Sequence, residues 1–587
     1  MTSVDDRVPV VVPTAAITGS NPIRHDVRVA GYGAYGCVFV ITIGRRTLAL
    51  KAQRIDASNL QRVAALRNET GVLMVMRRLL TDRVTPNVLY VQRITAGPTR
   101  DPDYDRFIAD HADICPNIRE SDDIDNPLFH YTLMEYANGG TLHDFLAQGV
   151  PLGTKMLRGL AFQLAWTLAS AEQTVGFRHL DLHGKNILLH QYHGDTRQHT
   201  FRRQRGAFEQ DDYWRLAGVD QFVKLADMGL SRTATVPEVQ IYQEGFSGLI
   251  RILSPTAFFM DMMVQLQYTA ERPDDADTLR DQLHRGFHSD MWAYGVLLVE
   301  MALSGWTMPN TDTTWTPETE RLWYIGTHVS LESAQSLRDL KKLFRDRLLE
   351  LYPGHALFDR RVRLVDNYIN NLPGICLLNR ALGNGLLPTD ASIPGIANSV
   401  PYQLLNANRA ILERIGDGIY DQAVRYIRER HGDVFIDLVS KLLSWGVDER
   451  VTMRSGVHGL FMNHALLHQF FDELKITSTT SAVAGYTWSY NASRPITQLP
   501  FRPPDTTMRT RVILYTPPST IVGYSEMPVE PREVEIRAEL NPQSRSSIFR
   551  KPVTAAATTC PTLKLFLDYS SLNSDVCALL DTLAKYL

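Results

Sequence analysis

The sequence predicts an α+β protein with more than one compact unit, and three observations carry this prediction. Residues 28–55 are rich in Val, Ile, Phe and Thr, and glycines interrupt them as turns interrupt strands. From residue 59 onward, apolar residues recur instead at helical spacing over several segments. The 587 residues also exceed what one hydrophobic core normally serves. Strands followed by runs of helices are typical of the α+β class.

The composition is that of a globular chain without a strong charge preference. Hydrophobic residues make up 44% of the chain, charged residues make up 21%, and the net charge is −3. This balance indicates neither a nucleic acid nor a membrane as partner. The five cysteines are widely spaced, which argues against a disulfide framework or a Cys-rich zinc site. Because the acidic N-terminus does not resemble a signal peptide, we expect an intracellular protein, cytoplasmic or nuclear.

Helical periodicity is clearest in four stretches, at residues 59–80, 155–173, 285–305 and 430–473. After about residue 476 the composition shifts to Thr, Ser and Pro. That shift indicates a tail that is extended, strand-like or partly disordered. Within the tail, residues 572–587 have the apolar spacing of a short amphipathic helix.

A glycine pattern between two predicted strands indicates a phosphate-binding loop. The spacing of Gly31, Gly33 and Gly36 lets backbone N–H groups approach phosphate oxygens without an intervening Cβ atom. Dinucleotide-binding turns share this spelling, but they open a helix. Here the chain continues as a strand through Val38 to Lys51, and a strand lysine can reach nucleotide phosphates. Taken alone, Lys51 is equally compatible with a solvated surface lysine.

Two further positions extend this pattern. Glu69 lies in the middle of the following helix, where it can pack back on the strand and hold Lys51 near the phosphates. A solvent-facing glutamate is the alternative. Further on, an apolar strand leads to Glu135 and Ala137 and then to a glycine turn. Backbone groups of these two residues can bind an adenine edge, although a plain connection has the same sequence signature.

The decisive pattern is a polar loop followed by an acidic turn. Asp181 and Asn186 lie on one tight loop before an apolar strand. Asp181 can accept or orient the proton of an attacking hydroxyl, and Asn186 can bind Mg²⁺. Asp227 ends another apolar strand and offers a second oxygen ligand for magnesium. Both pieces, in this order after the glycine loop, indicate phosphoryl transfer from ATP with Mg²⁺ as cofactor.

The complete set resembles the signature of the eukaryotic protein kinase family over roughly residues 25–475. Residues 179–189 (HLDLHGKNILL) are similar to the catalytic loop of that family, and residues 224–229 (KLADMG) to its metal-binding turn. Residues 289–301 resemble the helix whose aspartate, here Asp290, anchors the catalytic loop.

Residues 438–466 are similar to the closing segment of the kinase domain. Within it, Arg450 stands where the family pairs an arginine with a glutamate at the end of the activation segment. Glu271 is the candidate for that glutamate.

The resemblance implies a bilobal fold with ATP in the cleft. The implied units are an N-terminal extension at 1–24, a β-rich lobe at 25–136, a helical lobe at 137–475 and a C-terminal extension at 476–587. Insertions are expected near 190–220 and 311–430, because these spans are longer than in the family. The resemblance also implies that the chain phosphorylates Ser or Thr hydroxyls of protein substrates.

Several site residues are assigned by the resemblance. Val38, Ala49 and Leu188 are expected to sandwich the adenine. His183 and Lys185 belong to the catalytic loop, with His183 standing where Ser/Thr-specific members carry lysine. The spelling around these two positions is also similar to atypical kinases and small-molecule phosphotransferases.

The chain departs from the family at two other positions. Leu180 replaces the arginine that receives an activation-loop phosphate, which implies a kinase not switched on through that contact. Met228 replaces a phenylalanine and should still pack. Its insertions give the chain a similarity in style to kinases of large DNA viruses, which would place it in a host cell.

The basic segment at residues 197–205 belongs to an inserted hairpin. We expect a solvated surface excursion there, with nuclear targeting or an acidic partner as alternatives. For the whole chain, the alternatives to a protein kinase are a pseudokinase scaffold and a small-molecule phosphotransferase.

Overall fold

The computed structural model describes the chain in separate stretches. The described residues are 9–10, 25–33, 36–43, 46–55, 60–98, 128–191, 198–205, 209–216, 221–233, 288–308, 314–317, 335, 338–339, 342–343, 346, 374–389, 392, 396–398, 400–415, 418–446, 465–476, 485–492, 509–513, 533–537 and 565–566. The predicted helix at 572–587, Glu271 and Arg450 lie outside them.

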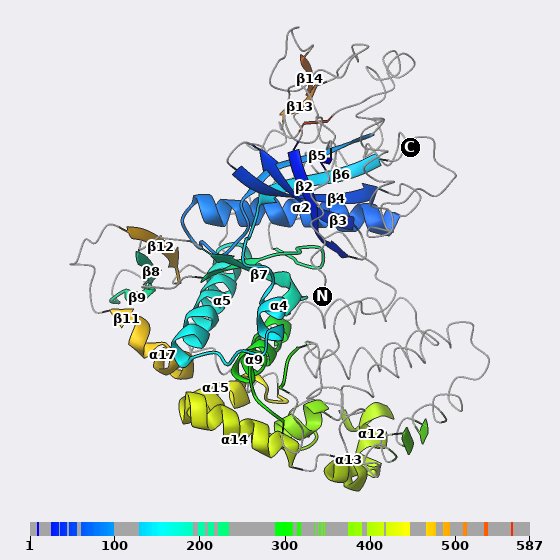
Figure 1. The fold of residues 1–587 in the computed structure, drawn as a ribbon, viewed down its shortest axis with the longest axis vertical. Helices are drawn as coiled ribbons and strands as arrows, with labels where there is room; N and C mark the ends of the chain where they lie inside the picture. The colour runs from blue at the N-terminus through cyan, green and yellow to red at the C-terminus, as the bar shows by residue number, and fades with distance from the viewer. Residues whose placement is uncertain are drawn as a thin grey trace.

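The first lobe is an antiparallel sheet with one long helix against it (Figure 1). Its strand order is β1-β2-β3-β4-β6-β5-β15. The bounds are β1 Pro9–Val10, β2 His25–Gly33, β3 Gly36–Ile43, β4 Arg46–Ile55, β5 Val91–Pro98, β6 Leu128–Glu135 and β15 Leu565–Phe566, with helix α2 at Leu60–Thr81. The strands predicted for residues 28–55 and the helix predicted for 59–80 are therefore confirmed.

The second lobe is mainly helical. Its helices are α4 Leu142–Ala147, α5 Thr154–Val175, α9 His288–Ala302, α12 Val400–Ala407, α13 Arg409–Ile415, α14 Ile419–His431, α15 Asp433–Leu442 and α17 Ala465–Phe470. Short 3-10 turns are η2 Gly184–Asn186, η6 Ile396–Asn398 and η8 Asp472–Leu474. Strands β7 Ile187–Gln191 and β10 Gln221–Leu225 pair with each other next to the first lobe. Together the two lobes confirm the α+β class.

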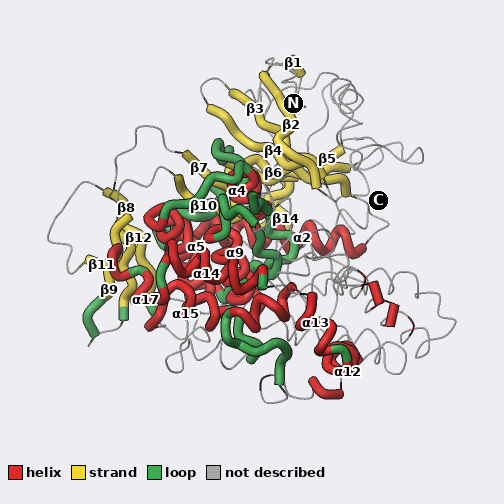
Figure 2. The backbone as a smooth tube through the Cα atoms, turned by 60° about the horizontal axis from the view of Figure 1, so that its bottom comes forward, coloured by secondary structure: helices red, strands yellow, loops and turns green. Residues whose placement is uncertain are grey.

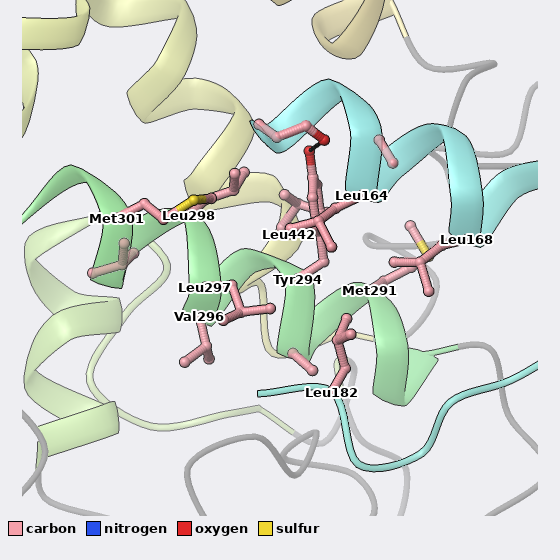
Figure 3. Close-up of a cluster of buried hydrophobic side chains, with 14 of the residues drawn as sticks. Leu164, Leu168, Leu182, Met291, Tyr294, Val296, Leu297, Leu298, Met301 and Leu442 are labelled. Atoms are coloured by element: carbon pink, nitrogen blue, oxygen red, sulfur yellow. Dashed lines mark hydrogen bonds between the residues drawn. The ribbon is translucent and has the colours of Figure 1, made fainter. Parts of the chain in front are cut away.

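Helices α5 and α9 form the centre of the helical lobe (Figure 3). Leu164 and Leu168 of α5 meet Met291 and Tyr294 of α9 in one buried cluster. The buried Tyr294 hydroxyl donates to the Ala161 carbonyl at 3.0 Å, so the polar atom of this apolar contact is satisfied.

Local sequence explains where several helices begin and end. Thr141 and Asp144 form a capping box that starts α4. Helix α5 ends at Val175, and the following Gly176 caps it with a φ of +64°, which suits a residue without a Cβ atom. The stretch predicted to be helical at 430–473 contains α15 and α17, and Gly432 at φ +83° separates α14 from α15. Helix α15 then ends at Leu442.

A second sheet lies beside the helical lobe, and we call it the accessory sheet (Figure 2). Its order is β11-β9-β8-β12, with bounds β8 Gln198–Gln204, β9 Asp212–Leu216, β11 Lys475–Ile476 and β12 Gly485–Asn491. The β8–β9 pair is the predicted inserted hairpin, and β12 from the predicted tail runs parallel to β8. A separate pair joins β13 Arg509–Ile513 to β14 Glu533–Arg537.

The inserted hairpin is not a solvated excursion. Six aromatic rings, which we call the aromatic cluster, join it to α5 and to β12. They are Phe162, Trp166, Phe201, Trp214, Phe471 and Tyr490. Phe201 and Trp214 are fully buried, because alternate residues of each strand face α5.

The arginines of this hairpin are paired with acidic side chains. Arg203 Nη2 lies 3.2 Å from Asp212 Oδ2, and Arg205 Nε lies 2.6 Å from the same oxygen. Arg202 Nη2 lies 2.7 Å from Asp211 Oδ2. This internal pairing disfavours the alternative that the arginines form an open patch for an acidic partner.

The described residues also show the state of two cysteines and whether any helix could span a membrane. Cys37 is disulfide-bonded, whereas Cys376 is free and buried. Within the described stretches, no helix is long and apolar enough to span a membrane.

Candidate active site

Lys51 of β4 stands between two carboxylates. Its Nζ atom lies 2.6 Å from Glu69 Oε1 on α2 and 3.4 Å from Asp227 Oδ1. Burial lowers the pKa of Lys51, but the charges of Asp227 and Glu69 outweigh it and raise the pKa above its ordinary value. The same lysine lowers the pKa of Asp227. Lys51 and Asp227 are therefore both charged at neutral pH.

The predicted glycines lie at the tip of the β2–β3 hairpin. Gly33 is the register partner of Gly36, and Gly31 is that of Val38. A Cβ atom at Gly36 would lie 2.2 Å from the Ala52 carbonyl oxygen, so packing alone requires glycine there. A Cβ at Gly31 would meet nothing within 4 Å, so packing does not explain that glycine.

The three predicted adenine contacts share one small apolar cluster. Ala49, Leu89 and Met134 are its buried members, and Val38, Tyr136, Leu188 and Ala226 pack against them. The elements come from both lobes, so the cluster sits where the lobes meet. Sequence reasoning missed Leu89, Met134, Tyr136 and Ala226, although Met134 and Ala226 directly precede predicted site residues.

Glu135 is fixed by a network that the sequence did not reveal. Its backbone N–H donates to the Tyr90 carbonyl at 2.9 Å, and its Oε1 accepts from the Tyr90 N–H at 2.8 Å. Lys224 Nζ donates to the same oxygen at 2.8 Å, although Lys224 is buried. Because the N–H of Glu135 is taken, the adenine contacts proposed here fall to its carbonyl and to the backbone of Ala137.

The loop from His179 to Leu189 holds Asp181 from two sides. Asn186 Nδ2 donates to the carbonyl of Asp181 at 2.9 Å and to its Oδ2 at 3.0 Å. His183 Nδ1 lies 3.2 Å from the Lys185 backbone N–H, which can only donate. The remaining proton of a neutral His183 is thus assigned to Nε2, which faces Asp181 Oδ2 at 3.5 Å.

The loop before Asp181 adopts a backbone that leucine rarely takes. Leu180 has φ +62°, and Asp290 holds it there by accepting the N–H groups of His179 at 2.7 Å and Leu180 at 2.9 Å. Burial raises the pKa of Asp290. His179 in turn lies 3.1 Å from the Ala226 carbonyl, next to Asp227.

Asp227 also has a left-handed backbone, at φ +55°. The next residue, Met228, is only 1% exposed, so it packs as the sequence predicts. In this turn the Gly229 N–H lies 3.4 Å from Asp227 Oδ1 and donates to it. The Asp227 side chain is about half exposed, at 53%.

The residues present fit a magnesium ion held partly by phosphate. Since Asn186 uses its nitrogen on Asp181, its Oδ1 is the atom left for a cation. Together with Asp227 this gives oxygen donors on neighbouring loops, a set that Mg²⁺ prefers. No group of three or more His, Cys, Asp or Glu converges as a metal site within the described stretches.

Comparison with known proteins agrees with this geometry. A protein kinase domain model matches residues 109–471, which is more than half of the chain. The chain therefore belongs to the protein kinase family. That match begins after Lys51 and Glu69, so the assignment of those two residues rests on their geometry.

One curated relative is described as a probable serine/threonine-protein kinase of Dictyostelium discoideum. It is 28% identical over 134 residues, which are 23% of this chain and 10% of the relative. The match thus spans about a tenth of the length of that relative.

Proposed function

We propose that the chain transfers the γ-phosphoryl group of Mg-ATP to Ser or Thr hydroxyls of protein substrates. The observation that supports the proposal is that Lys51 Nζ lies 2.6 Å from Glu69 Oε1 and 3.4 Å from Asp227 Oδ1, beside the loop of Asp181 and Asn186. The description of the Dictyostelium relative supports a Ser/Thr acceptor.

In this proposal the first lobe and the apolar cluster bind and orient ATP. The adenine ring is proposed to lie between Val38, Ala49 and Leu188, and the glycine hairpin to cover the phosphates. Lys51, kept charged by its two carboxylates, binds the α- and β-phosphates. Glu69 keeps the lysine in place without occupying the phosphate site.

Residues on the loops of the second lobe carry out the phosphoryl transfer in this proposal. Magnesium, when bound by Asn186 and Asp227, would neutralise charge on the phosphates. The substrate hydroxyl oxygen attacks the γ-phosphorus, the bond to the β–γ bridging oxygen breaks, and ADP leaves. Asp181 orients the hydroxyl and accepts its proton, while His183 restrains the carboxylate. Lys185, which is exposed, offers a cation to the transferred group.

The test is phosphoryl transfer from γ-labelled ATP with Mg²⁺, using generic protein substrates and the chain itself. Asp181→Asn and Lys51→Met should each lower incorporation by at least about 100-fold while the protein stays folded. Phosphoserine and phosphothreonine should account for the label. A folded wild type that binds ATP without transferring phosphate would instead indicate a scaffold or a small-molecule acceptor.

A further inference from the structure

Four buried polar side chains lie where helix α2 faces the sheet, and we call them the polar layer. Glu69 and Thr70 belong to α2, Gln53 to β4 and His130 to β6. Gln53 lies two residues after Lys51 on β4, so both side chains face the same side of the sheet. Gln53 Nε2 donates to Glu69 Oε2 at 3.2 Å, while Lys51 takes Oε1. Both oxygens of the Glu69 carboxylate are therefore held from one strand.

A second bond ties the neighbouring turn of α2 to β6. The Thr70 hydroxyl donates to the Leu66 carbonyl at 2.8 Å, so it accepts from His130 Nε2 at 2.9 Å. Burial, together with the charge of Lys51, lowers the pKa of His130 to about 3. His130 is consequently neutral at physiological pH and acts here as a donor.

A third hydrogen bond connects α2 of the first lobe to the helical lobe. Asn68, buried and adjacent to Glu69, donates from Nδ2 to the Ser231 carbonyl at 2.8 Å. The Ser231 hydroxyl donates to the His179 carbonyl at 3.1 Å. A short chain of bonds thus links α2 to the segment after Asp227 and to the catalytic loop.

The Ser231 segment is itself well anchored. Arg178 and Arg232 exchange backbone hydrogen bonds of 2.8 Å in both directions. Ser231 therefore offers α2 a fixed point that belongs to the helical lobe. The hydrogen bonds from Asn68 to Ser231 and from Ser231 to His179 require no phosphorylated residue. Leu180, next to His179, has no positive charge that could bind a phosphate.

We propose that Asn68 is a positioning residue for phosphoryl transfer, because its bond to Ser231 sets the rotation and height of α2 one residue before Glu69. The proposal rests on the function proposed above. Without this bond, Glu69 can move away from Lys51. The nearest remaining anion is then Asp227, already 3.4 Å from the lysine. A lysine drawn onto Asp227 competes with magnesium for that carboxylate.

The test uses a matched pair of variants in the full chain. Asn68→Leu keeps the shape of the side chain but removes the donor to Ser231. Asn384→Leu is the control, because Asn384 Nδ2 likewise donates to a serine carbonyl, that of Ser440, at 2.8 Å in the helical lobe. For each protein, kcat, KM for ATP and the Mg²⁺ concentration at half-maximal rate are measured, together with Tm.

We expect Asn68→Leu to lower kcat by about 10- to 100-fold, since small misplacements of catalytic groups have effects of this size. The Mg²⁺ concentration at half-maximal rate should rise several-fold, and both changes should be absent in Asn384→Leu. Should Asn68→Leu not fold, Asn68→Ala provides the same comparison with less crowding.

Outcomes of this experiment separate the two proposals. If wild type transfers phosphate but Asn68→Leu matches Asn384→Leu in rate and Mg²⁺ dependence, the positioning role is wrong and the kinase stands. If folded wild type transfers no phosphate, the proposed function itself is wrong. A lower Tm with unchanged kinetic constants would make Asn68 merely structural and would also overturn the proposal.

Discussion

Helices α2 and α5 have 22 residues each, but they differ in how much of their contact with the rest of the protein is polar. Helix α5 is buried along most of its length, and the aromatic cluster packs against it. Helix α2 also buries apolar side chains from Val72 to Leu79, but its turn around Glu69 meets the sheet through the polar layer and meets the helical lobe through Asn68. Helix α5 is thus held mainly by apolar area, whereas directional bonds position the turn of α2 that carries Glu69.

This difference separates stability from positioning. Apolar burial contributes free energy in proportion to area and does not depend on the exact direction of contact. A buried hydrogen bond contributes about 1 kcal/mol net, but it specifies where its two partners lie. We therefore expect changes around α5 to unfold the protein, and changes under α2 to affect activity more than stability.

The largest expected effect is the removal of a ring from the aromatic cluster. Trp214→Ala should lower the free energy of unfolding by about 3–5 kcal/mol, because Trp214 is fully buried and a cavity remains. Denaturant unfolding measures this loss. The control Tyr486→Ala changes a ring of the same sheet that is 37% exposed, and it should stay within about 1 kcal/mol of wild type. Equal effects would show that the cluster does not stabilise the helical lobe.

A truncation tests the strand that the tail contributes to this cluster. A chain ending at residue 476 lacks β12 and its buried Tyr490, whose ring lies 4.9 Å from that of Trp166. It should lose at least about 2 kcal/mol of unfolding free energy, the lower end of the cost of removing a large buried side chain. A chain ending at residue 500 keeps β12 and should lose much less, as urea unfolding of the two would show. Two equally stable truncations would contradict the bracing role of β12.

The polar layer should make stability depend on pH. His130 has a folded pKa of about 3, below its ordinary value of about 6.5, so the unfolded chain binds a proton more readily. Its stabilising contribution is therefore present above pH 6.5 and is lost as the pH falls toward 3. Between pH 7 and pH 5, wild type should lose about 2 kcal/mol more than His130→Gln. Parallel stability curves for the two proteins would exclude this coupling.

The smallest effect on stability is expected beneath α2 itself. Gln53→Met removes the donor to Glu69 Oε2 but keeps an extended side chain of similar size, so unfolding should change by about 1 kcal/mol. The rate of phosphoryl transfer should nevertheless fall several-fold, because Glu69 is less restrained. A loss of stability as large as that of Trp214→Ala would remove the contrast between the two helices.

Much of the candidate site could be predicted from local patterns. The glycine hairpin, the strand to Lys51 and the loop from Asp181 to Asn186 each have a recognisable spacing within a short segment. The Lys51–Glu69 pair was predicted across 18 residues because a strand followed by a helix constrains where both side chains lie. Contacts between distant segments, such as Lys224 with Glu135, gave no such signal.

The inserted hairpin shows why such contacts escape prediction. Its arginines looked like a solvated basic patch, since the sequence does not state which acidic residue faces them. Only the pairing of β8 with β9 brings Arg203 to Asp212 and turns Phe201 and Trp214 toward α5.

The sequence by itself determined the α+β class, the positions of α2 and α5, and the residue types that phosphoryl transfer requires. These features depend on periodicity and on chemistry within a few residues of each other. Tertiary structure alone decided that β12 joins β8 and that Asn68 reaches Ser231. The reason is physical: backbone ladders and buried amide bonds can form with many partners of similar chemistry. The partner is chosen by how the whole chain packs.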